Sequence, residues 1–397
     1  MKTRRLLGLV LSAVIVLTFL TFSEQLQAAE EFKFGVMLPL SGAGSTYGIP
    51  QLNAIKMAVE EINGKGGITV AGKKYALSPI VYDDKGLPSE GVTIFEKLVN
   101  FDKVKVILGP VNSGNVMAIA PKVGDQTILM TTGTIVSAYT ELGNPYIFRP
   151  HTSVKNIINA LLDFMTKDLD IRSLGMVASK NPVTIEQIDA IVAKFKKEGR
   201  AFWVEYCDLQ ATNLYPQITS LATKKPDAMY PMGYPDQTAL TYKQMHELGL
   251  APKYRISTSA GSAEEFLRVT SADILEGCYE AGAATLDTVI QSGSVKAIEF
   301  YKRFKEKFGV APSSPAGTNS YDVVYILAKA VENSGTVTDL VKMRTALQNI
   351  GKVEQTILDY PVVKGKIFNE KNEIYVGGAL RQFRNGEFKF IKFIGVH

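Results

Sequence analysis

Short apolar runs alternate with helical patterns along the first part of the chain. The runs have the length of β-strands and are apolar almost throughout; they span residues 32–40, 75–82, 104–108 and 127–130. Between them, apolar residues recur every three or four positions at 51–62 and 89–100, and a further helical pattern begins at Ser113. Apolar strands separated by amphipathic helices predict a parallel sheet with helices on both faces.

The same order restarts after Arg149-Pro150. Helix-like and strand-like segments alternate at 154–165, 174–178, 185–195, 202–207, 215–221, 228–231, 237–248 and 254–257. Two amphipathic helices are expected after them, at 295–308 and 321–331. No residue-level repeat relates the two halves, so what repeats is the order of the elements. We therefore expect two doubly wound α/β units of similar size.

The last part of the chain has a different pattern. Residues 374–383 and 388–394 have the composition of strands, and they flank the four residues Arg384-Asn385-Gly386-Glu387. Asn-Gly between two strands favours a tight hairpin, because both residues tolerate a left-handed backbone. An antiparallel pair of strands is therefore expected here.

The first 29 residues have the order of a secretory signal peptide. A basic start precedes an apolar run at 6–22 and a polar patch that leads to Ala28-Ala29. Cleavage after Ala28 lowers the formal net charge from +5 to +3, because the segment carries three basic residues and one acidic residue. Cleavage after Ala29 is equally compatible. An uncleaved anchor is the alternative, since the run approaches the length that spans a bilayer.

Charge and cysteine content narrow the classes of function. A small positive charge without a basic run argues against nucleic-acid binding. The three histidines, at 151, 246 and 397, lack the spacing of a metal site, and we expect neither a metal nor a cofactor. Cys207 and Cys278 lie in apolar stretches, which favours two buried thiols, with a disulfide as the alternative.

Two junctions between a strand and a helix are candidate binding sites. They span residues 109–115 and 130–140, at the carboxyl ends of predicted parallel strands, where ligands bind in such sheets. Each offers backbone N–H groups and the positive end of a helix dipole, which favour a carboxylate. The hydroxyl of Ser113 would either cap its helix or hold that carboxylate; the first reading needs no ligand.

Motifs for catalysis are weak. Gly42 and Gly44 suggest a dinucleotide fingerprint, but the third glycine, Gly48, comes one residue late. Residues 67–74 imitate a phosphate-binding loop, yet Lys74 stands where Ser or Thr should hold Mg²⁺. A hydrolase that used Ser113 would need a base such as His151. We therefore expect a binding protein rather than an enzyme.

The order of four motifs resembles one family. FGVMLPLSGAGSTYG, AVEEINGKGGI, IVYDDKG and VILGPVNSG are similar to the periplasmic substrate-binding proteins of ABC importers for branched-chain amino acids. The resemblance covers essentially the whole chain after the signal peptide and is clearest over residues 33–140. It implies two α/β lobes joined by three crossovers, which close on a ligand by a hinge. We expect lobe 1 to comprise 30–148 and 283–355, and lobe 2 to comprise 149–282 and 356–397.

The resemblance also implies ligand-binding residues. The family's carboxylate-binding serine matches Ser113, and Val111 before it matches an apolar wall. The next junction, whose backbone and threonine hold the same carboxylate, matches Thr134, Ile135 and Val136, so Val136 replaces the threonine. Two positions match aromatic walls of the family pocket, one in each lobe: Tyr47 and Tyr234.

Two departures from the family pattern affect the expected ligand. The acidic residue that faces a ligand ammonium matches Ala260, so a plain amino acid is disfavoured unless Asp236 or Glu264 reaches the pocket. A bulky aromatic near a crossover is replaced by Ala316, which enlarges the pocket. The pattern therefore favours an aromatic or aliphatic carboxylate over an amino acid.

The resemblance implies capture and transport. We expect a monomeric periplasmic protein that closes on a small carboxylate-bearing ligand and delivers it to an ABC permease in the inner membrane. The alternative is a secreted binding module that serves a sensor or receptor. The sequence does not separate these two possibilities.

Overall fold

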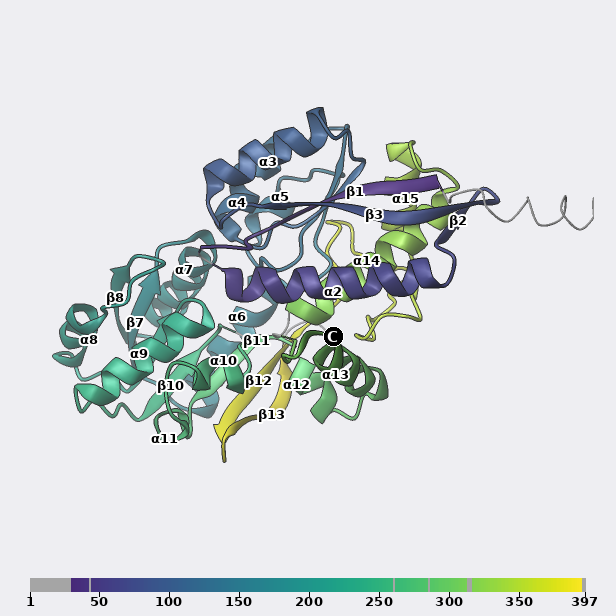
Figure 1. Ribbon diagram of the computed structural model, residues 1–397. Helices are drawn as coiled ribbons and strands as arrows, with labels where there is room; N and C mark the ends of the chain where they lie inside the picture. The colour runs from purple at the N-terminus through teal and green to yellow at the C-terminus, as the bar shows by residue number, and fades with distance from the viewer. Residues whose placement is uncertain (1–29, 43, 260, 285, 313–315, 395–397) are drawn as a thin grey trace, which may run out of the picture.

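The computed structural model describes residues 30–42, 44–259, 261–284, 286–312 and 316–394. These residues form two α/β lobes, each built on one sheet (Figure 1). The expected signal peptide at 1–29 and the matched position Ala260 lie outside the described residues. Among the residues that the structure describes, no helix is long and apolar enough to cross a membrane.

The first sheet has six strands in the order β2-β3-β1-β4-β5-β6. Their bounds are β1 (Glu30–Leu38), β2 (Ile68–Val70), β3 (Lys73–Asp83), β4 (Val106–Leu108), β5 (Ile128–Met130) and β6 (Ile147–Phe148). β2 pairs antiparallel with β3, and the other neighbours pair parallel, as predicted. β2 was not predicted; Ala71 and Gly72, with φ of 48° and 84°, form the tight turn that leads from it into β3.

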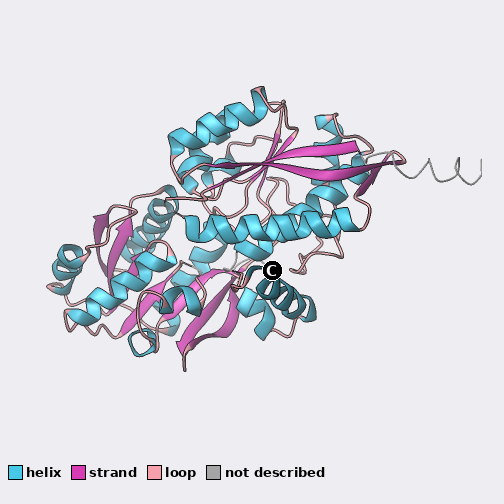
Figure 2. Cartoon of the chain, viewed as in Figure 1, coloured by secondary structure: helices cyan, strands magenta, loops and turns pink. Residues whose placement is uncertain are grey.

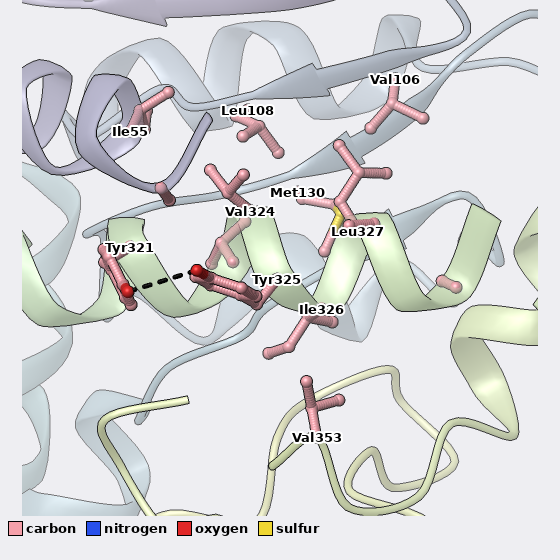
Figure 3. Packing of buried hydrophobic residues seen from close by; sticks show 14 of the residues in the cluster. Ile55, Val106, Leu108, Met130, Tyr321, Val324, Tyr325, Ile326, Leu327 and Val353 are labelled. Carbon is pink, nitrogen blue, oxygen red and sulfur yellow. Dashed lines mark hydrogen bonds between the residues drawn. The ribbon is translucent and has the colours of Figure 1, made fainter. Parts of the chain in front are cut away.

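Helices cover both faces of the first sheet. They are α2 (Ser45–Gly64), α3 (Pro88–Asn100), α4 (Ser113–Ile119), η2 (Ala120–Lys122), α5 (Ala138–Glu141), α13 (Val295–Phe308), α14 (Ala316–Ser334) and α15 (Leu340–Gln348). Val36 of β1 belongs to the core that includes α2 and α14, part of which Figure 3 shows. The next residue, Met37, belongs to the core of α3 and α4 on the opposite face. This alternation makes the lobe doubly wound.

The second sheet has seven strands in the order β13-β12-β11-β10-β9-β7-β8. Their bounds are β7 (Ser173–Ser179), β8 (Ala201–Cys207), β9 (Ala228–Met232), β10 (Tyr254–Ser257), β11 (Tyr279–Ala283), β12 (Gly378–Arg384) and β13 (Glu387–Ile394). The five strands from β7 to β11 are parallel, and β12 and β13 are antiparallel additions. The predicted hairpin is confirmed: Asn385 and Gly386 have φ of 53° and 86°, and Arg384 pairs with Glu387.

Helices also flank the second sheet on both faces (Figure 2). They are α6 (Val154–Asp163), η3 (Phe164–Asp168), α7 (Pro182–Lys197), α8 (Tyr215–Ala222), α9 (Pro235–Glu247), α10 (Ala263–Leu267) and α11 (Ala272–Leu275). One core contains α6 and α7, and the other contains α8 and α9. Cys207 and Cys278 are both free and buried in the second of these cores, so the prediction of two thiols is confirmed.

Three crossings join the lobes. The first follows β6, the second follows β11 and leads into α12 (Leu286–Gln291), and the third precedes β12. Ile357, Phe368 and Ile374 pack into the core of the first lobe. We therefore propose that the third crossing lies between Ile374 and β12, later in the chain than the predicted boundary at residue 356.

Candidate functional site

A cavity lies between the lobes, at the carboxyl ends of the parallel strands. It contains about 920 Å³ of space free of protein atoms, part of which is open to solvent. Both lobes contribute to its wall, and among the described residues that line it there is no Asp, Glu, Lys or Arg. A site of this size suits a small organic ligand. The ligand would have to be held by neutral groups.

The first predicted junction lies in this wall. β4 ends at Leu108, and the chain turns at Gly109, whose φ is 106°. A Cβ atom at Gly109 would lie 2.0 Å from the carbonyl oxygen of Met37, so only glycine fits this turn. The turn brings Val111 and Ser113 to the cavity.

The helix-capping role of Ser113 is wrong. Ser113 is the first residue of α4, and the cap position belongs to Asn112, whose side chain makes no capping hydrogen bond. A residue inside the first turn cannot adopt the extended cap conformation. The hydroxyl of Ser113 therefore lies at the cavity wall without a capping task.

The second predicted junction follows β5. Gly133, Thr134 and Ile135 line the cavity, as the resemblance implied for the last two. Val136 does not line it: the side chain is buried in the core of α3 and α4, and its N–H group lies 3.5 Å from Oγ1 of Thr134. A role of Val136 in ligand binding would therefore fall to its backbone.

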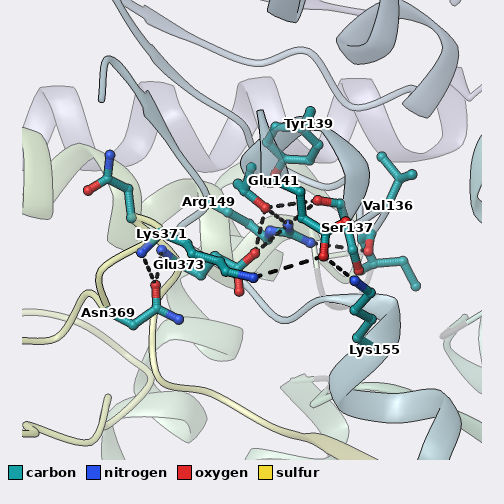
Figure 4. A network of polar contacts seen from close by, with 12 residues as sticks. Val136, Ser137, Tyr139, Glu141, Arg149, Lys155, Asn369, Lys371 and Glu373 are labelled. Carbon is teal, nitrogen blue, oxygen red and sulfur yellow. Dashed lines mark hydrogen bonds and ion pairs between the residues drawn. The ribbon is translucent and has the colours of Figure 1, made fainter. Parts of the chain in front are cut away.

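Arg149 fixes the shape of this junction (Figure 4). Its guanidinium donates to the carbonyl oxygens of Ile135 and Ser137, at 3.2 and 3.3 Å, and to Oγ1 of Thr140. The side chain is fully buried, and Glu373 neutralises it through an ion pair of 2.7 Å. The carbonyl oxygens of Ile135 and Ser137 therefore point toward the guanidinium. Because this cation offsets their partial negative charge, they repel a ligand carboxylate less.

His151 lines the cavity as a neutral ring. Its Nδ1 lies 3.0 Å from the carbonyl oxygen of Thr152, and its Nε2 lies 3.2 Å from Oγ1 of Thr131. A carbonyl accepts only, so Nδ1 carries the proton and Nε2 accepts from Thr131. Burial and the nearby Arg149 lower the pKa of His151 to about 3. Both nitrogens are thus occupied, and no hydrogen bond joins His151 to Ser113 among the described residues, which gives no support to a hydrolase.

Aromatic side chains from the two lobes meet across the cavity. The rings of Tyr47 and Tyr234 lie 5.3 Å apart between centroids, and both line the cavity. The Tyr47 hydroxyl donates to the carbonyl oxygen of Ser259 at 2.5 Å. The Tyr234 hydroxyl accepts from Nδ2 of Asn112 at 2.8 Å. These bonds join the lobes, so the structure is a closed form.

The acidic residues considered for a ligand ammonium do not reach the cavity. Asp236 and Glu264 are exposed, and Glu264 pairs with Arg268. Ala316 begins α14, but its side chain lies outside what the structure describes. The condition under which a plain amino acid remained possible, that Asp236 or Glu264 reaches the cavity, is therefore not met.

A buried carboxylate does lie behind the wall. Both carboxylate oxygens of Glu280 are 3.5 Å from Oγ of Ser259, and one also accepts from the hydroxyl of Ser257. Arg381 is equally buried, and its attraction to Glu280 opposes the lowering of its pKa by burial. Glu280 thus has a buried cation as a neighbour within the protein, and it is not among the described residues that line the cavity.

Sequence reasoning predicted Tyr234 but missed most of the second-lobe wall. Asn181, Thr184, Gln187 and Thr258 line the cavity, and Gln51 lines it from the first lobe. Some local signals existed. Gln51 stands four residues after Tyr47, on the same helix face. Asn181 and Thr184 form a capping box at the start of α7, directly after β7.

Comparison with known proteins decides the family. The sequence model of the periplasmic binding protein family matches residues 31–385, which is most of the chain. The chain belongs to this family. Within it, the curated relatives and solved structures place the chain with the leucine-binding-protein-like members, as the resemblance implied.

Three similar proteins illustrate this placement. The Leu/Ile/Val-binding protein BraC3 of Rhizobium johnstonii is 26% identical over 86% of this chain and 88% of its own. The crystal structure of the leucine-binding protein LivK of Thermotoga maritima has a TM-score of 0.79 and 20% identity, covering 91% of this chain and 98% of that one. An ABC transporter solute-binding protein of Rhodopseudomonas palustris, in complex with 3,4-dihydroxybenzoic acid, has a TM-score of 0.78 and 22% identity, covering 92% and 98%.

These likenesses establish the fold of this periplasmic binding protein. The predicted architecture of two doubly wound lobes with three crossings is confirmed. The family fold is that of solute-binding proteins.

Proposed function

We propose that this protein is the extracytoplasmic solute-binding component of an ABC importer. It captures a small carboxylate between its lobes and presents the closed form to a permease. One observation carries the proposal: the inter-lobe cavity is lined by Ser113 and by the junction at Gly133 to Ile135, yet by no charged side chain among the described residues. Hydroxyl and backbone N–H donors are suited to a carboxylate.

The same observation selects the ligand class. An amino acid brings an ammonium group, and burial of an unpaired charge is costly. Glu280 lies next to Ser259, but it does not line the cavity, and Arg381 attracts it from within the protein. We therefore infer a carboxylate without an ammonium, with an aromatic or aliphatic body against the rings of Tyr47 and Tyr234.

The experiment is a thermal-shift screen of the protein exported to the periplasm of a bacterial host. Its mass first shows whether processing follows Ala28 or Ala29. The panel contains benzoate, hydroxybenzoates, short aliphatic acids and the branched-chain amino acids. A ligand at a hundred times its dissociation constant adds about 2.7 kcal/mol to the free energy of unfolding, which raises the midpoint by several degrees.

Shifts with acids that lack an ammonium support the proposal. Shifts confined to leucine, isoleucine and valine would overturn the ligand class, and no shift with any carboxylate would overturn capture of a carboxylate altogether.

Ser113→Ala tests the carboxylate clamp. A hydrogen bond to a charged group contributes about 1.5 to 3 kcal/mol, so we expect the dissociation constant of the bound acid to rise about tenfold to a hundredfold. Ser220→Ala is the matched control, because Ser220 lies in α8 and bonds to Glu205 rather than lining the cavity. Calorimetric titration measures both. Equal affinity of Ser113→Ala and the wild type would show that Ser113 does not bind the ligand carboxylate.

A further inference from the structure

Gln51 lies in the cavity wall and has a donor that makes no hydrogen bond to any described residue. The residue lines the cavity but is fully buried, and its Nε2 has no hydrogen-bond partner among the described residues. Its Oε1 accepts from Oγ of Ser320 at 3.1 Å, which fixes the orientation of the amide. A Cβ atom at Gly133 would lie 3.1 Å from this Nε2 and equally far from Cγ1 of Val111. The NH₂ group of Gln51 therefore adjoins both junctions of the first lobe.

Gln187 presents a similar group from the second lobe. It is buried in the cavity wall, and its Oε1 accepts from the hydroxyl of Tyr230 at 2.7 Å and from Oγ1 of Thr258 at 2.9 Å. These bonds hold the carbonyl end of the amide against the second sheet. All side-chain hydrogen bonds of Gln187 to other described residues are made by Oε1, so the NH₂ group is left for a ligand.

We propose that Gln51 and Gln187 are a pair of neutral donors that determine specificity, one binding the ligand carboxylate and the other a second oxygen acceptor on the same ligand. This inference rests on the proposed function and extends it. Gln51 takes the carboxylate because its NH₂ group adjoins Gly133 and Val111, next to Ser113. Gln187 takes a hydroxyl or carbonyl oxygen on the part of the ligand that faces the second lobe.

Two physical reasons support this division. A buried NH₂ group without a hydrogen-bond partner is unfavourable. We therefore expect a bound ligand to supply the missing acceptor. A site built to hydrogen-bond a substrate group also rejects analogues that lack the group, because its own polar atoms would then be left unpaired. The substrate class is therefore a carboxylic acid that carries a second oxygen function and no ammonium.

The test uses benzoate and 3,4-dihydroxybenzoate as probes, which share a carboxylate and differ in hydroxyl groups. Calorimetric titration of the wild type should show at least tenfold tighter binding of 3,4-dihydroxybenzoate. Gln51→Met should weaken both probes at least tenfold. Gln187→Met should remove the preference for 3,4-dihydroxybenzoate and leave benzoate within about twofold of the wild type.

A second pair of variants separates ligand contact from folding. Gln51→Glu keeps the shape of the side chain and the hydrogen bond from Ser320 but replaces the NH₂ donor by an anionic oxygen. The affinity for both probes should therefore fall below that of Gln51→Met. Gln244→Met is the control: Gln244 is buried in α9 and bonds to Thr212 and Leu214, away from the cavity. It should lower the unfolding midpoint without changing the affinity for either probe.

Each outcome decides the matter. Unchanged affinity in Gln51→Met, or an unchanged preference in Gln187→Met, would overturn the inference while the proposed function stands. Equal affinity of the wild type for both probes would show that Gln187 does not bind a second oxygen acceptor on the ligand, and this would overturn the inference. If the wild type binds neither probe, the inference falls; it falls with the proposed function if no other carboxylate binds.

Discussion

At the scale of single residues, burial sets the chemistry of the site more than residue type does. His151 is an ordinary pH-sensitive residue in the sequence, but in the fold its ring is neutral and fully bonded, with a pKa lowered to about 3. Unfolding would return it to a value near 6.5. As the pH falls below 6.5, the unfolded chain binds a proton that the folded chain does not. His151 therefore destabilises the fold progressively between pH 6.5 and pH 3.

This sign can be tested with His151→Gln. We expect the free energy of unfolding of the wild type, relative to the variant, to fall by about 1.4 kcal/mol per pH unit between pH 6 and pH 4. Urea denaturation at several pH values measures it. Burial raises the pKa of Glu265 and Asp322 to about 7, so these groups act in the opposite direction. The wild type and the variant both contain Glu265 and Asp322, so these groups cancel in the comparison. Parallel plots of the free energy of unfolding against pH would contradict the lowered pKa of His151.

At the scale of elements, the loop after β5 depends on one buried ion pair. Arg149 holds two carbonyls of that loop and pairs with Glu373, which precedes the third crossing. The loop supplies Gly133, Thr134 and Ile135 to the cavity. The ion pair near the crossings therefore also holds the loop that lines the cavity in place.

Arg149→Met should lower the free energy of unfolding by about 3 to 5 kcal/mol, because it leaves the largely buried carboxylate of Glu373 without its cation. Replacement of both partners, Arg149→Met with Glu373→Met, should recover part of this loss. Arg268→Met is the control; its pair with Glu264 is exposed, and such pairs contribute about 0 to 1 kcal/mol. Chemical denaturation measures all three. An Arg149→Met protein as stable as the control would contradict a central role for the pair.

At the scale of the whole molecule, the lobes are held closed by contacts across the cavity. Tyr47 bonds to Ser259, and Asn112 bonds to Tyr234. A third bond runs from the N–H of Ser137 in the first lobe to Glu186 of α7, at 2.7 Å. A ligand between the lobes would add to these contacts, which shifts the population toward the closed form.

Tyr234→Phe removes one of these bonds and keeps the ring. We expect the affinity for the bound acid to fall about threefold to tenfold, because a smaller share of the protein is closed before ligand binds. X-ray scattering should show a smaller radius of gyration with saturating ligand in the wild type and a larger ligand-free value in the variant. Tyr215→Phe, whose hydroxyl bonds to Glu247 on the surface, is the control. A radius of gyration that ligand leaves unchanged would exclude hinge closure.

Local patterns in the sequence determined the framework. Apolar strands between amphipathic helices predicted both sheets, and Asn385-Gly386 predicted the hairpin, because these features depend on neighbouring residues alone. The junctions at Val111 to Ser113 and at Thr134 to Ile135 were also predictable, since the carboxyl ends of parallel strands meet at one edge. The short β2 and β6 were missed, because two or three residues carry too little pattern, and β11 was missed as well.

Only the tertiary structure decided the chemistry of the cavity. Gln187 meets Tyr230 and Thr258, and Arg149 meets Glu373, across intervals of chain that no local pattern spans. The helix-capping role of Ser113 failed because the start of α4 depends on the turn at Gly109, which packs against β1. Burial and partner geometry arise when distant segments pack together, and they decide which polar groups are satisfied and which remain for a ligand.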